Sequence, residues 1–125
     1  MDGVRVDDLM SLLPEFFVPE RAAGINFVAA FILGGEKGGD YTVTIRDQKC
    51  EITKENPPRS DIKLEADAET ILNIFSGALD PMKAYMRGLL HVSGNIRLAM
   101  KIAELFDVDY ERLKNLGNNY RESPS

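Results

Sequence analysis

The side chains that most catalytic and metal sites require are scarce in this sequence. Its 125 residues include one cysteine, Cys50, and one histidine, His91. A single cysteine excludes an internal disulfide and a zinc site built from cysteines. Long apolar runs are also lacking, because the longest, residues 27–33, is far shorter than the roughly 20 residues that cross a bilayer. The sequence therefore predicts no transmembrane segment and no metal site.

Positive charge is in short supply as well. The chain has 15 Lys and Arg residues against 20 Asp and Glu residues, which gives a formal net charge of -5. This balance predicts no general attraction to nucleic acid or to an anionic membrane. Asp7 and Asp8 interrupt the N-terminal region before any apolar stretch develops. We therefore expect no signal peptide and a cytoplasmic location.

Length and composition are those of one ordinary globular domain. Hydrophobic residues make up 44% of the chain and charged residues 28%. A chain of this size rarely supports two independent cores. The polar stretch 118–125 is expected to be disordered. The sequence thus predicts a single domain over residues 1–117.

Four segments of the first two thirds of the chain read as strands. Segments 41–46, 49–53 and 61–66 alternate apolar and polar residues, and segment 25–33 is apolar on both faces. A period of two indicates a sheet with one buried face, which is typical of antiparallel pairing. The apolar outward side of segment 25–33 is open to two explanations: cover by a dimer partner, or shielding by polar side chains of neighbouring strands.

Helical periodicity flanks and follows these strands. Residues 7–17 read as an amphipathic helix that Pro14 interrupts, and Asp67 and Asp80-Pro81 are start signals for two further helices. A short fifth strand over 89–93, a helix over 96–106 and a last helix ending at Gly117 complete the prediction. The fold class is α+β, with a five-stranded, mostly antiparallel sheet covered on one face by helices.

The helix predicted over residues 96–106 has more apolar surface than one sheet can cover. Its apolar side chains fill an arc of roughly 220°, whereas a surface helix needs about 100°. The excess must contact another helix, a second subunit or an apolar ligand. Met82 and Met86, one turn apart on the preceding helix, suit a wall that accepts variable apolar shapes.

Candidate catalytic residues are isolated from one another. His91 is expected to face outward without a partner, and Cys50 to face the core as an inert thiol. The glycines of segment 34–39 join two strands and lack the Lys-Ser/Thr ending of a phosphate loop. The sequence therefore predicts a protein with no catalytic residues and no cofactor.

The ordered motifs resemble those of the sterol carrier protein 2 domain, a family of small lipid-binding domains. The resemblance covers roughly residues 10 to 106. Its most specific part is Gly77-x-Leu79-Asp80-Pro81, followed by Gly88-x-Leu90-x-Val92-x-Gly94. His91 and Ser93 stand where relatives often have lysines, which favours a stand-alone microbial member.

The resemblance implies an apolar tunnel between the sheet and the helices. Such a tunnel accepts a fatty acid, fatty acyl-CoA, sterol or phospholipid, and the domain itself is non-catalytic. The alternative is a protein-interaction or homodimerisation module of the same fold that carries no lipid. The residues that the resemblance places around the tunnel are Phe31, Leu33, Leu72, Phe75, Met82, Met86, Leu98, Ile102, Leu105 and Phe106.

Overall fold

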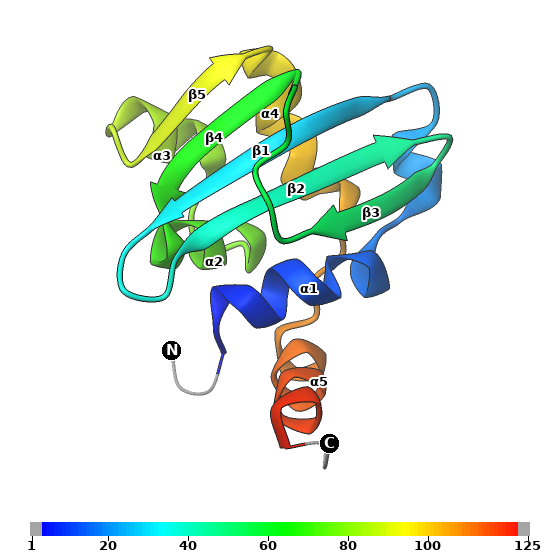
Figure 1. Ribbon diagram of the computed structural model, residues 1–125, viewed down its shortest axis with the longest axis vertical. Coiled ribbons are helices and arrows are strands. Elements are labelled where there is room, and N and C mark those ends of the chain that lie inside the picture. The colour runs from blue at the N-terminus through cyan, green and yellow to red at the C-terminus, as the bar shows by residue number, and fades with distance from the viewer. Residues whose placement is uncertain (1–3, 123–125) are drawn as a thin grey trace.

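The computed structural model describes residues 4–122, with residues 117–122 as backbone only. It contains five strands, five α-helices and two 3-10 helices, drawn in Figure 1. In chain order these are α1 (Val6–Phe16), η1 (Pro19–Ala22), β1 (Phe27–Gly34), β2 (Gly39–Arg46), β3 (Lys49–Thr53), β4 (Ile62–Asp67), α2 (Ala68–Phe75), α3 (Pro81–Met86), β5 (Leu90–Gly94), α4 (Ile96–Lys101), η2 (Ile102–Leu105) and α5 (Tyr110–Glu122).

The strands form one mixed sheet in the order β3-β2-β1-β4-β5. Three of the four neighbouring pairs are antiparallel, and β1 and β4 are parallel. Helices α2, α3 and α4 lie behind one face of this sheet, and α1 runs beside the β3 edge (Figure 1). The predicted α+β class, with a mostly antiparallel five-stranded sheet and helices on one face, is confirmed.

The parallel pair requires a crossover, and this crossover covers the face of the sheet opposite the helices. After β3, residues 54–61 pass across β2 and β1 in front of the sheet (Figure 1). The Thr42 hydroxyl donates to the carbonyl of Glu55, and the backbone N–H of Asp61 donates to the Val28 carbonyl over 2.8 Å.

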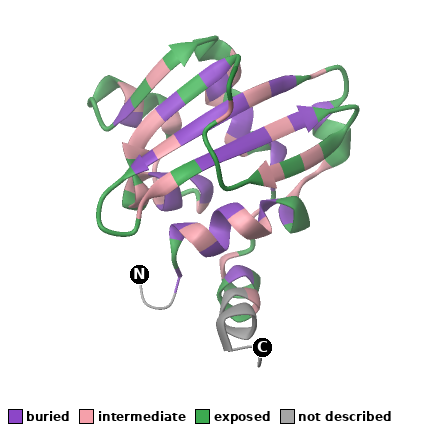
Figure 2. Ribbon diagram, viewed as in Figure 1, coloured by how far each residue is buried: buried purple, intermediate pink, exposed green. Residues whose placement is uncertain are grey.

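This crossover explains why β1 is apolar on both faces. Ala30 on the outward side is 1% exposed and Thr42 beside it is 8% exposed. Figure 2 shows the buried residues concentrated on the central strands. The chain's own crossover, which neither sequence-based explanation included, buries the middle of the outward face.

Helix α1 closes the core below the sheet. Leu9, Met10 and Leu13 are at most 1% exposed, and the buried carboxylate of Asp8 accepts from the backbone N–H of Arg5 over 3.2 Å. Pro14 does not end the helix, which continues to Phe16. A proline in the last turn removes a single intrahelical hydrogen bond, so the final residues keep their helical backbone.

The C-terminal region differs from the prediction in two places. The helix predicted over 96–106 changes at Ile102 from α-helix to the tighter 3-10 form. The last helix begins at Tyr110, where Asp109 accepts from the Arg112 N–H over 3.1 Å, and continues past Gly117 to Glu122. The helix end predicted at Gly117 is therefore wrong. Residues 123–125 of the predicted tail lie outside the described residues.

Candidate functional site

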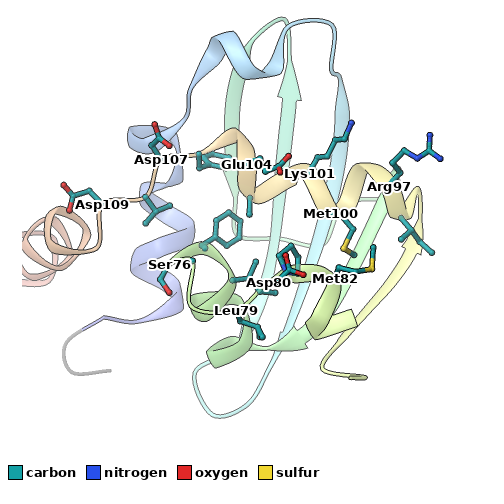
Figure 3. A pocket seen from close by; sticks show the side chains of 18 residues that line it. Ser76, Leu79, Asp80, Met82, Arg97, Met100, Lys101, Glu104, Asp107 and Asp109 are labelled. Carbon is teal, nitrogen blue, oxygen red and sulfur yellow. The ribbon is translucent and has the colours of Figure 1, made fainter. Parts of the chain in front are cut away.

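An open groove of about 1080 Å³ runs between the α2–α3 corner and the α4–η2 segment (Figure 3). Its walls are mainly apolar, with Asp107 and Asp109 at one end, Arg97 at the other, and further charged side chains between them (Figure 3). The apolar lining residues are Ile74, Phe75, Leu79, Pro81, Met82, Ile96, Met100, Ala103, Phe106 and Val108. The polar ones are Ser76, Asp80, Arg97, Lys101, Glu104, Asp107 and Asp109.

Local capping signals fix the two helices that border the groove. The Asp80 carboxylate accepts from the Lys83 N–H over 3.1 Å, and Pro81 occupies the first turn of α3. The Asn95 side chain accepts from the Leu98 N–H over 3.0 Å at the start of α4. Because each cap satisfies an N–H that the helix leaves free, the start of each helix is fixed. Met82 and Met100 consequently face each other across the groove (Figure 3).

Four phenylalanines form a continuous series from the groove to the sheet. The ring centroids of Phe17 and Phe106 are 5.6 Å apart, those of Phe106 and Phe75 are 5.8 Å apart, and those of Phe75 and Phe31 are 6.3 Å apart. These separations lie within the range of favourable aromatic pairs. Phe75 stands at the centre of the series, between the groove and the sheet.

A second, much smaller hollow lies on the sheet side of Phe75. Its volume is about 20 Å³, room for about one water molecule. Phe31, Leu64, Ile71, Leu90, Ala99 and Ile102 line it, together with four residues that also line the groove: Ile74, Phe75, Pro81 and Ala103. The hollow large enough for a lipid lies at the open side of the helical layer.

The acidic end of the groove is tied to the N-terminal part of the chain. Arg21 donates to both carboxylate oxygens of Asp107, over 2.8 and 3.1 Å, and to the Glu104 carbonyl over 3.1 Å. The backbone N–H of Val18 donates to Leu105, and that of Asp107 donates to Phe16. These contacts hold the segment after η2 in place and with it the Phe106 side of the groove.

The structure brings together about half of the residues predicted to surround a tunnel. Phe75, Met82 and Phe106 line the groove, and Phe31, Phe75 and Ile102 line the smaller hollow. The others lie outside both pockets. Leu33, Leu72 and Leu105 are buried in the core, Leu98 is half-buried, and Met86 is 78% exposed.

Sequence reasoning missed several groove residues, including Ile96, Met100, Arg97 and Lys101. The signal for the first two was present, because both belong to the wide apolar arc of the predicted helix 96–106. Which part of that arc faces a groove depends on the position of α3, which local periodicity does not encode.

The isolated reactive side chains remain apart from the groove. His91 is exposed on β5 and lies opposite Glu65 of β4. Burial raises the pKa of the Cys50 thiol to about 12, so the unreactive protonated form predominates at neutral pH. Across the side chains of residues 4–116, no group of His, Cys, Asp and Glu residues has the arrangement of a metal site. No described helix is long and apolar enough to span a membrane.

Comparison with solved structures places the fold beside two kinds of protein. The sec-alkylsulfatase Pisa1 from Pseudomonas sp. matches with a TM-score of 0.73 and 19% identity, over 81% of this chain and 16% of that enzyme. The palmitated sterol carrier protein 2-like 2 from Aedes aegypti matches with a TM-score of 0.59 and 18% identity, over 81% of this chain and 93% of that protein. At these identities the likeness shows the fold.

Sequence comparison identifies the family. The chain is 29% identical over 101 residues to Hydroxysteroid dehydrogenase-like protein 2 of Rattus norvegicus, a match that covers 80% of this chain and 19% of that protein. The chain thus spans about a fifth of the length of this curated relative. The pattern of the SCP-2 sterol transfer family matches residues 11–107, and the chain therefore belongs to the SCP-2 sterol transfer family.

Proposed function

We propose that the protein is a non-catalytic carrier that binds the apolar chain of an amphipathic lipid, such as a fatty acid, in the groove between α2–α3 and α4–η2. One observation carries this proposal: an open groove of about 1080 Å³ with a floor of Phe75, Phe106 and two methionines. Ligand sites commonly measure about 300–1,000 Å³ and are mainly apolar, so the groove is large enough for such a ligand.

Burial of the lipid chain supplies the binding free energy. Ten methylenes that leave water at about 0.8 kcal/mol each contribute about 8 kcal/mol, which corresponds to a dissociation constant near 1 μM before the cost of association. Methionine side chains adapt to different chain shapes. We therefore expect affinity no tighter than micromolar, and weak discrimination between chains that differ by one methylene, since one such group changes the binding free energy by about 0.8 kcal/mol.

The two methionines of α3 provide a matched test. Met82 is 44% exposed and lines the groove, whereas Met86, one turn later, is 78% exposed and lies outside it. Displacement of a fluorescent fatty acid should be saturable, and Met82→Glu should weaken binding at least about tenfold because it places a charge on the apolar wall. Met86→Glu should change affinity less than about twofold, because its side chain remains in water.

Two results would contradict the proposal. One is the absence of saturable fatty acid binding by the folded parent protein. The other is an equal loss of affinity in Met82→Glu and Met86→Glu, which would show that the groove is not where the chain binds. Circular dichroism of each variant shows whether the fold is retained.

An interaction module is the second candidate. The relatives from Rattus norvegicus and Pseudomonas sp. are much longer than the matched region, and large apolar side chains at Met82, Met86, Leu89 and Ile96 are exposed. Sedimentation at several protein concentrations separates the two functions. A stable dimer that excludes fatty acid favours the module, and a monomer that binds fatty acid favours the carrier.

A further inference from the structure

Strand β5 forms an edge of the sheet that is open to solvent. Within residues 4–122 it pairs with β4 alone, and Figure 1 shows no element running alongside its outer edge. The opposite edge strand, β3, has α1 beside it (Figure 1). An exposed edge strand presents backbone N–H and C=O groups that can pair with a further strand. The outer edge of β5 is therefore a candidate site for strand addition.

The β5 edge lacks the features that normally protect an edge strand. Residues 88–96 contain no Asp, Glu, Lys or Arg and no proline. The register of β5 with β4 continues from Leu90 to Gly94 without a bulge. By contrast β3, which also has five residues, carries Lys49 and Glu51. Charge, proline, bulges and cover are the usual means of preventing strand addition, so their absence from β5 indicates an edge that is open to a partner.

Positive charge stands at both ends of this edge. Arg87 lies three residues before β5 and Arg97 three residues after it, and both side chains are exposed. Neither forms an ion pair with the described side chains of residues 4–116. Three residues span at most about 10 Å, which is also about the screening length at moderate salt. Each charge therefore acts on a chain that pairs with the adjacent end of β5.

The charge of the surrounding region decides which kind of strand fits. Residues 81–103 contain four of the 15 Lys and Arg residues and none of the 20 Asp and Glu residues. Antiparallel pairing of β5 with the same strand of a second copy would bring two such regions together, and like charges in contact disfavour that pairing. A segment with acidic residues on both sides of an uncharged core would instead place opposite charges at both ends. The complementary partner is thus an extended acidic peptide and not a second copy of this chain.

Exposed apolar side chains flank the same edge. Leu89 is 46% exposed just before β5, Ile96 is 38% exposed just after it, and Val92 at its centre is half-buried. In strand addition the main-chain hydrogen bonds supply affinity, and contacts of alternate side chains supply specificity. A partner with β-branched residues in its core fits a pleated, partly apolar surface of this kind.

We propose that the outer edge of β5 binds an extended peptide segment with a β-branched core and acidic residues on both sides, which joins the sheet as a sixth strand. Hydrogen bonds to the free backbone groups of β5 hold the core of the segment, and Arg87 and Arg97 attract its two ends. No residue of β5 lines the groove. Peptide addition is therefore a second binding function, distinct from the proposed lipid site.

Fluorescence anisotropy with synthetic peptides tests the edge. The probe is a labelled peptide with a core of alternating valine and threonine, as long as β5, and two glutamates at each end. One control peptide has lysines in place of the glutamates, and the other keeps the glutamates but is methylated at the backbone nitrogens of its core. The glutamate probe should bind saturably. Both controls should bind at least about tenfold more weakly, because one reverses the charge and the other removes the N–H donors.

Two matched double variants test the residues at the ends of the edge. Arg87→Glu with Arg97→Glu should weaken binding of the glutamate probe at least about fivefold, because attraction becomes repulsion at both ends. Arg46→Glu with Lys49→Glu makes the same change of charge on the exposed β2–β3 hairpin and should stay within about twofold of the parent. Circular dichroism shows whether each variant is folded. Hydrogen exchange locates the peptide, which should slow exchange at amides of β5.

Several outcomes would overturn peptide addition. These are the absence of saturable binding of the glutamate probe, equal binding of the three peptides, an equal loss in both double variants, and slowed exchange confined to elements other than β5. A dimer in sedimentation whose β5 amides are protected without peptide would show that a second copy occupies the edge. Displacement of a fluorescent fatty acid reports on the groove separately. Normal displacement with no peptide binding would remove the β5 site and leave the proposed carrier function standing.

Discussion

Phe75 is the side chain that separates the groove from the interior of the molecule. It lines both the groove and the smaller hollow, and its ring contacts Phe106 on one side and Phe31 on the other. A lipid chain that extends from the groove toward the sheet meets this ring, because the ring lines both hollows. We therefore expect the position of this side chain to influence how deeply a ligand is buried.

Phe75→Ala should therefore change stability and binding in opposite directions. We expect the free energy of unfolding to fall by about 3–4 kcal/mol, because a buried ring is lost, and fatty acid affinity to rise several-fold, because the chain can enter between the layers. Phe27→Ala, at a buried position outside both pockets, should lower stability similarly and leave affinity unchanged. Urea denaturation and fatty acid displacement measure the two effects.

A fall in affinity for Phe75→Ala comparable to that for Met82→Glu would show that the ring is a wall of the site and not a barrier within it. If Phe75→Ala does not fold, Phe75→Leu offers a smaller change of the same kind.

Gly94 is a second position at which a single residue matters, here for the pairing of β5 with β4. Its φ is +97°, and a Cβ atom built on it would lie 2.2 Å from the Asp61 carbonyl oxygen. Gly94→Ala should lower the free energy of unfolding by about 2–4 kcal/mol, because β5 must move away from β4. Gly88→Ala has a similar φ of +76° but no atom within 4 Å, so about 1 kcal/mol is expected. Equal losses in urea denaturation would contradict a steric role for Gly94.

At the scale of elements, the crossover 54–61 is the part that joins the two halves of the sheet. Its last residue, Asp61, pairs twice with Val28 of β1: its N–H donates to the Val28 carbonyl and its carboxylate accepts from the Val28 N–H, both over 2.8 Å. The β1–β2–β3 antiparallel unit and the β4–β5 antiparallel pair are thereby joined at the start of the parallel pairing.

Asp61→Ala should weaken this junction without disrupting the core. We expect a loss of about 1 kcal/mol in the free energy of unfolding and faster hydrogen exchange at the Val28 amide, because that amide loses its acceptor. Asp40→Ala is the control, since the exposed Asp40 carboxylate has no hydrogen bond or ion pair with the described side chains of residues 4–116. Unchanged exchange at Val28 in Asp61→Ala would show that water replaces the carboxylate at no cost.

Elements with a strong local signal could be predicted from the sequence. Alternation, turn residues and capping signals predict strands β2 and β3, the Asp47-Gln48 turn between them and the start of α3 at Asp80-Pro81. The continuation of α5 past Gly117 could not be predicted, because glycine lowers helix propensity by only about 1 kcal/mol and does not forbid a helix. The change from α-helix to 3-10 helix at Ile102 could not be predicted either, because the apolar pattern continues unchanged there.

For the whole molecule, the sequence predicts the layers, and packing between distant segments determines the site. The α+β class follows from the two periodicities of the chain. The parallel pairing of β1 with β4 does not, since either direction suits the same apolar residues. The groove likewise depends on the distance between α3 and α4, which explains why Met82 lines it and Met86, with the same local pattern, remains outside.

The positions of the charged side chains relative to the groove also depend on the fold of the whole molecule. A net charge of -5 describes the chain as a whole. Folding brings Asp107 and Asp109 to one end of the groove and Arg97 to the other, with Asp80, Lys101 and Glu104 between them (Figure 3). An amphipathic ligand would thus meet an apolar floor with charged side chains of both signs along its sides.

Amide NMR of the isotope-labelled protein during titration with a fatty acid tests the central claim most directly. The carrier account predicts saturable shifts at the α2–α3 corner and along α4–η2, centred on the residues around Phe75 and Met100, with the β2–β3 hairpin unchanged. Shifts confined to the hairpin or the crossover, or an unchanged spectrum in the presence of micromolar to millimolar fatty acid, would contradict it.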